Sequence, residues 1–421
     1  MENGTHSKTT RRDFLRGAAA GLTAAAALSG YSRAFAQGGG TLRAGLIGCG
    51  GRGTGAANDF IRGPEDTEVI ALADLFPEKM DLTRERLGDR IDVPDDMCFS
   101  GFDCYEKILQ TDIDVILIAS PPHFRPAEFA AAIAAGKHVF MEKPLGVDPV
   151  GVRQIMITAE EAEEKGLAVV IGTIKRHQES YLEAYQRVQD GAIGEITALR
   201  AYHCGGPLGG WDRTDESPTI EEQVRAWQHW TWLSGDHIVE QQIHNSDVCN
   251  WFKGDWPVSA YGMGYRARKT YGNGYDFFCI DFEFADGVHM QSMARQQPDC
   301  DNNVSEAIVG SMGECRVHGG GAEIRDLDGN VTWEMRGNQG YAYVQEHIDM
   351  VASIRAGQPL NEARDVAQST LAAIMGRESA YSGRTRTWED TMNANLDLGP
   401  VQYELGATFD PRPTPTPGTI V

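Results

Sequence analysis

Short apolar runs alternate with helical segments in the first half of the chain. Strands are expected at residues 41–47, 68–73, 114–120, 137–141 and 168–173, with helices between them at 54–61 and 126–135. Apolar strands separated by helices are typical of a parallel sheet that is covered on both faces. Ligands bind at the carboxyl ends of the strands in such sheets.

The second half of the chain follows a different pattern. Strands are expected at 195–202, 277–284, 288–295 and 307–309, and helices at 181–189, 344–356 and 363–382. Several of these strands alternate apolar and polar residues, and turns such as Ala285-Asp286-Gly287 are typical of hairpins. The pattern predicts a second α/β domain with a largely antiparallel open sheet.

Composition narrows the classes of function. Hydrophobic residues make up 41% and charged residues 23% of the 421 residues, as in core-forming globular proteins, which argues against a multi-span membrane protein. Acidic residues outnumber basic ones by 60 to 38, and the net charge of -22 would repel a phosphate backbone. We therefore expect no nucleic-acid partner.

The first 36 residues have the pattern of a twin-arginine export signal. Arg11-Arg12 precedes an uncharged stretch, 17–32, and Ala34-Phe35-Ala36 fits the small-x-small cleavage rule. We predict passage through the twin-arginine export machinery, cleavage after Ala36, a periplasmic or otherwise exported location and no membrane insertion afterwards. A chance arginine pair before an alanine-rich helix is the alternative. Because this route carries folded proteins loaded with a cofactor, a cofactor site is expected.

A glycine-rich turn joins the first expected strand to the first helix. Residues 48–53 read Gly-Cys-Gly-Gly-Arg-Gly, and the next strand closes on Asp74. In a Rossmann dinucleotide site the first glycine allows the turn, the second lets the backbone approach the pyrophosphate and the third packs helix on strand. Asp74 would bind the ribose hydroxyls, so NAD is favoured over NADP, and Arg52 weakens that preference. The alternative is a glycine-rich turn with an incidental aspartate.

Two further polar groups follow strand ends, Ser120-Pro121-Pro122-His123 and Glu142-Lys143-Pro144. The predicted cofactor-binding residues are therefore Gly48, Gly50, Gly51, Arg52, Gly53, Asp74, Ser120, Pro121, His123, Glu142 and Lys143. We divide the chain into an export signal (1–36), a Rossmann domain (41–173), a substrate and oligomerisation domain (174–385) and a C-terminal tail (386–421). The proline-rich end of the tail, 411–417, predicts an extended segment on the surface.

Titratable residues recur at helical spacing from residue 237 to residue 251. If this segment is one helix, His237, Glu240, His244, Asp247 and Trp251 share a face. One hypothesis is a solvated surface face, and a second is a metal site of two histidines and the glutamate. The third, which we favour, is a proton-relay and substrate face in which His244 is the base and Glu240 orients it. The segment lacks the HExxH arrangement, so no metal is predicted.

Taken in order, the glycine-rich start, Glu142-Lys143-Pro144 and His244-x-x-Asp247-x-x-x-Trp251 resemble the Gfo/Idh/MocA oxidoreductase family over residues 41–385. The resemblance implies a Rossmann domain followed by an α/β domain whose sheet shields the nicotinamide and often supports oligomerisation. It also implies that Lys143 lies beside the nicotinamide and the substrate hydroxyl. The family typically has an aspartate where this chain has Glu240.

Two other departures from the family pattern lie near the expected pocket. Arg125 replaces a histidine found in many members, and residues 172–177 read Gly-Thr-Ile-Lys-Arg-His where a glutamine often precedes an arginine pair. The predicted catalytic residues are Lys143, His244 and Glu240, and the predicted substrate-binding residues are Lys143, Arg176, His177, Glu240, His244 and Asp247.

The function implied is that of an exported NAD(P)-dependent oxidoreductase. It would transfer hydride between a secondary hydroxyl of a sugar or cyclitol and a tightly held nicotinamide cofactor, and it would form a homo-oligomer. Because free NAD is scarce outside the cytoplasm, a second carbonyl substrate would re-oxidise the cofactor in place. An NAD-dependent glycosidase that uses transient oxidation and elimination shares every motif. A non-catalytic nucleotide or sugar binder is a further alternative.

Overall fold

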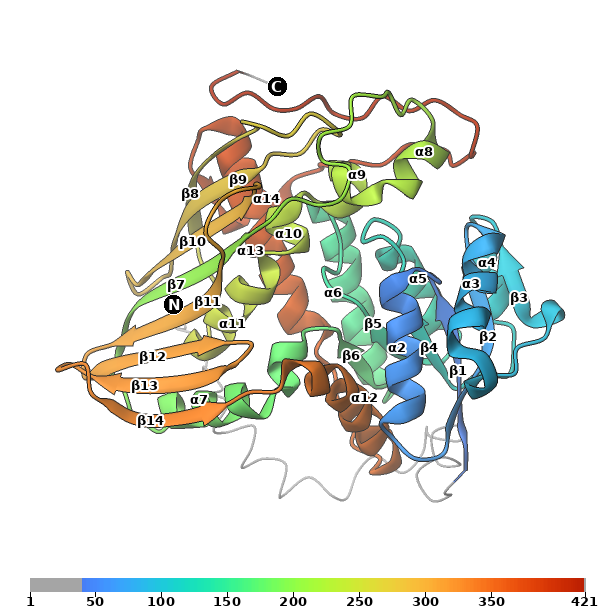
Figure 1. Cartoon of the computed structure of the whole chain (residues 1–421), viewed down its shortest axis with the longest axis horizontal. Helices are drawn as coiled ribbons and strands as arrows, with labels where there is room; N and C mark the ends of the chain where they lie inside the picture. The colour runs from blue at the N-terminus through green and yellow to red at the C-terminus, as the bar shows by residue number, and fades with distance from the viewer. Residues whose placement is uncertain (1–39, 420–421) are drawn as a thin grey trace, which may run out of the picture.

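The computed structural model describes residues 40–419, so the predicted export signal lies outside the described part of the chain. These residues form two sheets with helices packed against them (Figure 1). The strands of the first sheet are β1 (Leu42–Ile47), β2 (Thr67–Asp74), β3 (Cys98–Ser100), β4 (Val115–Ile118), β5 (His138–Met141) and β6 (Val169–Ile171). They are parallel, in the order β3-β2-β1-β4-β5-β6, which confirms the predicted Rossmann sheet.

Helices pack on both faces of this first sheet. They are α2 (Gly51–Arg62), α3 (Pro77–Leu87), α4 (Cys104–Ile108), α5 (Arg125–Ala134) and α6 (Pro149–Glu164). Along β4, Val115 and Leu117 belong to one core cluster and Ile116 and Ile118 to another, because successive side chains point to opposite faces. The sequence analysis did not predict α6, although the side chain of Asp148 caps its start.

The second sheet is mixed and mostly antiparallel. Its strands are β7 (Ile196–Gly205), β8 (Ser259–Tyr265), β9 (Phe277–Glu283), β10 (His289–Gln296), β11 (Asn303–Gly310), β12 (Gly313–His318), β13 (Gly321–Asp326), β14 (Val331–Arg336) and β15 (Arg386–Thr387). The order is β14-β13-β12-β11-β7-β10-β9-β8-β15, with β7 and β10 the parallel pair. The predicted second α/β domain is confirmed.

One face of the second sheet is covered by helices. The helices that follow the first sheet in the chain are η3 (Ile174–His177), α7 (Glu179–Gln189), α8 (Ile220–Arg225), α9 (Thr231–Ser234), α10 (His237–Glu240), α11 (Ile243–Lys253), α12 (Gln339–Arg355), α13 (Ala363–Ser382) and α14 (Trp388–Asn393). Helix α11 packs on β7 and β11, and α13 packs on β8 and β9. Tyr261, Met263 and Tyr265 of β8 are 57%, 60% and 50% exposed, so the opposite face is open there.

Two segments do not follow the predicted domain limits. Met350, Val351 and Ile354 of α12 are buried in the core of the first domain, so this helix packs with the Rossmann sheet although it follows the second sheet in the chain. Residues 386–393, predicted as tail, form β15 and α14, and β15 pairs with β8 at the edge of the second sheet.

Residues 411–417 are extended and lie largely on the surface, as predicted, and the tail also makes contacts with both domains. The main chain of α8 donates to the carbonyls of Leu405 and Ala407, and the side chain of Asn273 donates to the carbonyl of Arg412. Leu398 is buried in a third core cluster with Phe76 of the first domain and Trp232 of the second. The tail therefore joins the two domains along the edge near α8 (Figure 1).

No helix within residues 40–419 combines the length and the apolar character that crossing a membrane requires. The eight cysteines are all unpaired, and Cys49, Cys104, Cys249 and Cys315 are buried.

Candidate functional site

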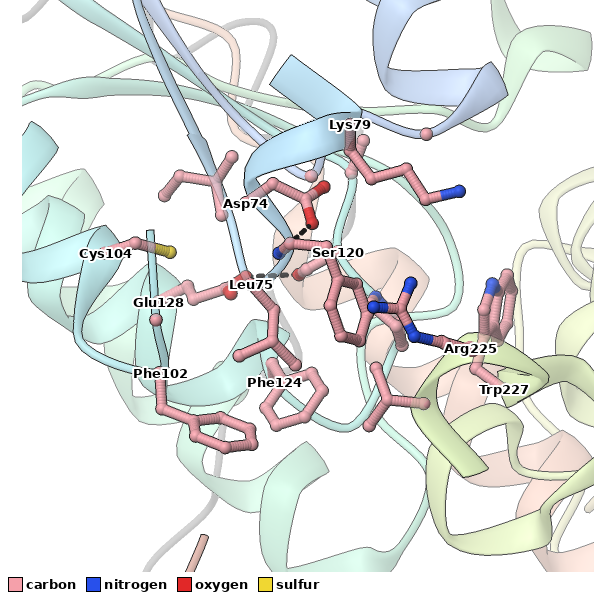
Figure 2. A pocket seen from close by; sticks show the side chains of 18 of the residues that line it. Asp74, Leu75, Lys79, Phe102, Cys104, Ser120, Phe124, Glu128, Arg225 and Trp227 are labelled. Carbon is pink, nitrogen blue, oxygen red and sulfur yellow. Dashed lines mark hydrogen bonds between the residues drawn. The ribbon is translucent and has the colours of Figure 1, made fainter. Parts of the chain in front are cut away.

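The glycine-rich turn lines a cavity of about 280 Å³ at the carboxyl ends of β1, β2 and β4 (Figure 2). Gly48 has φ +89°, and a Cβ there would lie 2.6 Å from the backbone of Ala119, while a Cβ on Gly53 would lie 1.8 Å from the Gly48 carbonyl oxygen. Gly50 and Gly51 have no atom within 4 Å of the same position. Gly48 and Gly53 therefore allow the tight turn, and Gly50 and Gly51 leave room for a ligand beside the start of α2. These features fit the pyrophosphate of a dinucleotide.

Asp74 lies at the wall of this cavity, at the end of β2. Its carboxylate accepts hydrogen bonds from the backbone N–H groups of Cys49, at 2.7 Å, and Phe76, at 2.9 Å. Burial raises the pKa of the carboxyl above its ordinary value. A carboxylate held in this position fits ribose hydroxyls as hydrogen-bond donors and disfavours a 2'-phosphate by charge.

Arg52 does not line the cavity. Its guanidinium lies 2.9 Å from Glu142 and 3.2 Å from Asp59, and it stacks 4.7 Å from the ring centroid of Tyr343. The sequence prediction that Arg52 weakens the preference for NAD assumed that it reaches the ribose side. Its carboxylate partners instead draw it toward the end of β5. Glu142 is therefore joined to the glycine-rich segment through Arg52.

The predicted residues after β4 have different surroundings. Ser120 and Pro121 line the cavity, and the Ser120 hydroxyl donates to Glu128, whose pKa burial raises to about 7 (Figure 2). His123 does not line it. Its Nε2 lies 2.6 Å from the Tyr403 hydroxyl of the tail, and burial lowers its pKa to about 4. His123 thus contacts the tail in this structure, and not the cofactor cavity.

Arg125, one of the departures from the family pattern, is buried between two strand ends. Its Nε donates to the carbonyl of Ser120 at 2.9 Å, and its guanidinium donates to the carbonyl of Pro144 at 2.6 Å. Burial lowers its pKa to about 10, so it stays charged at neutral pH. Arg125 therefore fixes the loop that carries Lys143 to the loop that lines the cofactor cavity.

Lys143 meets the second domain at Glu240. Its ammonium donates to Glu240 Oε1 at 3.0 Å and to the carbonyl of Glu240 at 2.5 Å, and only 8% and 10% of the two side chains is exposed. The second oxygen of Glu240 accepts from the Gln241 amide. An ammonium has three donors, so one proton of Lys143 remains for a ligand. The pair joins the end of β5 to α10.

The sequence analysis predicted that Glu240 orients His244, but no hydrogen bond joins these two side chains in the described residues. The segment is not one helix, because a turn at Gln241 and Gln242 separates α10 from α11. No side-chain or backbone group within residues 40–419 forms a hydrogen bond with the His244 ring. Burial, together with the charges of Lys143 and Lys175, lowers its pKa well below the ordinary value. His244 is therefore a neutral imidazole beside the Lys143–Glu240 pair.

The other members of the predicted stripe have structural partners. Asp247 forms a two-point ion pair with Arg176, at 2.8 Å for both contacts, and Trp251 stacks on the same guanidinium at 5.5 Å. His177 is held between Asp349, at 2.6 Å, and Glu362, at 3.3 Å. These carboxylates raise the pKa of His177 to about 10, against the effect of burial. Arg176, His177 and Asp247 therefore fix η3 against α11, α12 and α13.

His237 lies apart from the other members of the stripe. Its ring packs against Phe278, with centroids 5.0 Å apart, and burial lowers its pKa to about 4. Across the described residues, 40–419, no three His, Cys, Asp or Glu side chains are grouped so as to hold a metal ion.

Sequence analysis missed five polar residues beside this site. Glu306 of β11 accepts from Lys175, Tyr181 and Asn245, and His203 of β7 lies 2.8 Å from Asn245. Lys175 and Asn245 stand next to residues that the motifs singled out. Their partners lie up to 131 positions away in sequence, so no local signal connected them.

Comparison with known proteins gives two family matches. Residues 42–173 match the oxidoreductase family with an NAD-binding Rossmann fold known as Gfo/Idh/MocA, and residues 181–316 match a Gfo/Idh/MocA C-terminal domain. Inositol 2-dehydrogenase 3 of Saccharopolyspora erythraea is 27% identical over 352 residues, which cover 82% of this chain and 94% of that protein. Inositol 2-dehydrogenases of four further bacteria are matched over 53–57% of their own length.

Two solved structures show the same fold. Scyllo-inositol dehydrogenase from Lactobacillus casei, with bound NAD(H) and scyllo-inositol, has a TM-score of 0.64 at 23% identity, covering 83% of this chain and 99% of that one. Aldose-aldose oxidoreductase from Caulobacter crescentus, complexed with glycerol, has a TM-score of 0.66 at 19% identity, covering 82% and 99%.

Proposed function

We propose a function from the premise that this chain belongs to the Gfo/Idh/MocA family of oxidoreductases. It oxidises a secondary hydroxyl of a sugar or cyclitol and passes the hydride to a nicotinamide cofactor that it holds tightly. The observation that carries the proposal is the buried pair of Lys143 and Glu240, with the neutral His244 beside it, at the carboxyl edge of the Rossmann sheet. The inositol dehydrogenases and the aldose-aldose oxidoreductase to which the chain is similar favour a polyol substrate.

The bound nicotinamide supplies the hydride acceptor, and the side chains handle the hydroxyl and its proton. The free proton of Lys143 donates to the oxygen of the reacting hydroxyl, which fixes that oxygen beside the ammonium and favours the developing negative charge. His244 is uncharged at neutral pH and has no competing hydrogen bond, so its ring accepts the hydroxyl proton. Glu240 keeps the Lys143 ammonium in place.

NAD is the proposed cofactor. Asp74 stands where the adenosine ribose of a Rossmann site lies, and Arg52 is turned away toward Glu142. Arg225 reaches the opposite wall of the cavity, but its charge is shared with Glu78 and Glu221 (Figure 2). A 2'-phosphate would meet the carboxylate of Asp74, and although Lys79 also lines this cavity, its charge acts on Asp74.

Tight retention is proposed because the tail and α8 close over the adenosine end of the cavity. Arg225 and Trp227, from the second domain, line it opposite the glycine-rich turn. The Tyr403 ring lies 5.4 Å from Phe102 and 5.8 Å from Phe124, which also line it. A cofactor that leaves must displace contacts that join both domains and the tail.

Export and assembly are also part of the proposal. The twin-arginine pattern of residues 1–36 supports an exported protein, because that route carries folded, cofactor-loaded chains. The exposed row of Tyr261, Met263 and Tyr265 on β8 supports association of copies of this chain through the open face of the second sheet.

The test begins with the exported full-length protein. The nucleotide released on denaturation is identified by absorbance and mass spectrometry. The native protein is then incubated with scyllo-inositol, myo-inositol and common aldoses, with and without added NAD. We expect bound NAD(H), and NADH formation or coupled reduction of a second carbonyl compound.

Two outcomes would decide against the proposed oxidoreductase. Release of free sugar from a glycoside without accumulation of NADH would favour the glycosidase. Absence of both nucleotide and NAD-dependent turnover would favour a non-catalytic binder. The Lys143→Met variant, prepared and assayed in the same way, is the control. Turnover that depends on this site should fall in the variant.

A further inference from the structure

A buried polar chain runs from η3 through the second sheet to the edge of the reaction site. Lys175 and Glu306 form an ion pair whose side chains are 6% and 0% exposed. Glu306 also accepts from the Tyr181 hydroxyl at 3.0 Å and from the Asn245 amide at 2.6 Å. Every polar neighbour of this carboxylate is thus a donor.

These contacts fix the amide of Asn245 in one orientation. A carboxylate accepts hydrogen bonds, so the NH₂ group of Asn245 must face Glu306 and its carbonyl oxygen must face away. That oxygen lies 2.8 Å from Nδ1 of His203. Because a carbonyl can only accept, Nδ1 of His203 must carry the ring proton. Nε2 of the neutral ring is then left with a lone pair.

The ring of His203 lies near the residues of the reaction site. His203 is half-buried on the helix-covered face of β7, two residues beyond the buried Ala201. The charges of Lys175, Lys143 and Glu240 act on His203, and His203 in turn acts on His244. No group among residues 40–419 forms a hydrogen bond with Nε2. This atom is a fixed acceptor that lacks a protein donor.

We propose that Nε2 of His203 accepts a hydrogen bond from a hydroxyl of the bound polyol other than the one that is oxidised. The inference rests on the proposed function and names a residue that selects for the substrate. The neighbouring groups are Lys143, Lys175, Glu240 and His244. Burial and the two lysines lower the pKa of His203 to about 4, so the acceptor persists through neutral pH. An acceptor that cannot donate distinguishes a hydroxyl from an ether or carbonyl oxygen at the same position.

Two variants separate this role from simple packing. In His203→Asn the amide replaces Nδ1 and keeps the contact with Asn245, but nothing replaces Nε2. In His203→Gln the amide reaches the position of Nε2. We expect KM for the polyol to rise about 3- to 10-fold in His203→Asn, the loss of one hydrogen bond, with kcat unchanged, and to recover partly in His203→Gln. The unfolding midpoint and the bound nucleotide of His203→Asn should match those of the original protein.

Monodeoxy analogues of the polyol locate the contact. One analogue should show the same KM with the original protein and with His203→Asn, because the hydroxyl that His203 contacts is already missing. Independently, NMR of histidine labelled with the heavy nitrogen isotope should show His203 protonated at Nδ1, with its signal assigned by its loss in His203→Asn.

The outcomes distinguish the two proposals. If the original protein oxidises a polyol but His203→Asn has an unchanged KM, or if the ring is protonated at Nε2, the role of His203 is wrong and the proposed function stands. If the original protein oxidises no polyol, both are overturned.

Discussion

The lysines of two buried lysine–glutamate pairs lower the pKa of His244, and the two pairs differ in what surrounds them. Lys143 and Glu240 are 8% and 10% exposed, lie between two domains and leave one lysine proton unused. Lys175 and Glu306 are 6% and 0% exposed, and Glu306 also accepts from Tyr181 and Asn245. The residue types are the same in both pairs, but the Glu306 carboxylate accepts from three residues, whereas the Glu240 carboxylate accepts only from Lys143 and the adjacent Gln241.

The difference separates a reactive pair from a structural one. A fully bonded buried carboxylate holds its neighbours in one arrangement, and removing one partner leaves an uncompensated charge. A pair that lies between two domains, with fewer bonded partners and both side chains partly exposed, can bind a ligand without losing its internal contacts. We therefore expect substitutions at Lys143 to change chemistry more than stability, and substitutions at Lys175 to do the reverse.

The largest effect is expected for Lys143→Met. It removes the donor for the reacting hydroxyl, so kcat should fall by about 10²- to 10⁴-fold, the range for groups that assist proton transfer. Steady-state kinetics with the preferred polyol measures it. Lys165→Met, at an exposed lysine of the first domain, is the matched control and should keep full activity. Full activity of Lys143→Met would remove the catalytic role from this pair.

Lys175→Met is expected to cost stability. It leaves Glu306 buried without its cation, which destabilises proteins by about 3–5 kcal/mol. The denaturant midpoint should fall clearly, and the double variant Lys175→Met/Glu306→Gln should recover at least half of the loss because no uncompensated charge remains. An equal loss in Lys143→Met would mean that the two pairs do not differ as described.

The two pairs also show how far the sequence alone could lead. Lys143 follows a strand end in a recognisable three-residue group, and Gly48, Gly53 and Asp74 lie within one strand–helix–strand unit, so local spacing was sufficient. Glu306 belongs to β11, 131 positions after Lys175, and only the fold of the second sheet brings them together. Helical periodicity cannot predict pairing across a sheet.

The arrangement of the titratable stripe was only partly predicted, and the reason is related. The structure brings Glu240 and His244 near Lys143, but the spacing argument placed them on one face by assuming one continuous helix. The turn at Gln241 and Gln242 separates the two residues, and the packing of His237 against Phe278 removes it from the set. Tertiary contacts decided both points. The contacts of the tail with α8 and His123 were not predicted for the same reason, because these residues are distant in sequence.

A third buried ion pair can be tested by pH. The pKa of His177 is raised to about 10 by Glu362 and Asp349, so its charged form stabilises the folded state fully below pH 6.5, the ordinary value. That stability is lost as the pH rises toward 10, on the order of 1 kcal/mol per pH unit. His177→Gln should lose less stability than the original protein over this range, as measured by denaturant midpoints.

For the neutral histidines, the stability of the folded state depends on pH in the opposite direction. His203, His237 and His244 have lowered pKa values, so their contribution is lost only as the pH falls below 6.5. Above pH 6.5 they are uncharged in both the folded and the unfolded chain and do not mask His177. If the denaturant midpoints of His177→Gln and of the original protein change with pH in parallel between pH 6.5 and 10, His177 is not charged in the folded state.

The smallest effect is expected for Glu240→Asp, which introduces the residue that the family typically has at this position. The shorter side chain withdraws the carboxylate from Lys143, but the backbone carbonyl of residue 240 still accepts from the ammonium at 2.5 Å. Loss of one of the two contacts should lower kcat by about 3- to 10-fold, with little change in the unfolding midpoint. A loss as large as that of Lys143→Met would mean that the reach of the glutamate carboxylate is essential for positioning the ammonium. An unchanged kcat would mean that the backbone carbonyl alone holds Lys143, and that the carboxylate serves only to balance its charge.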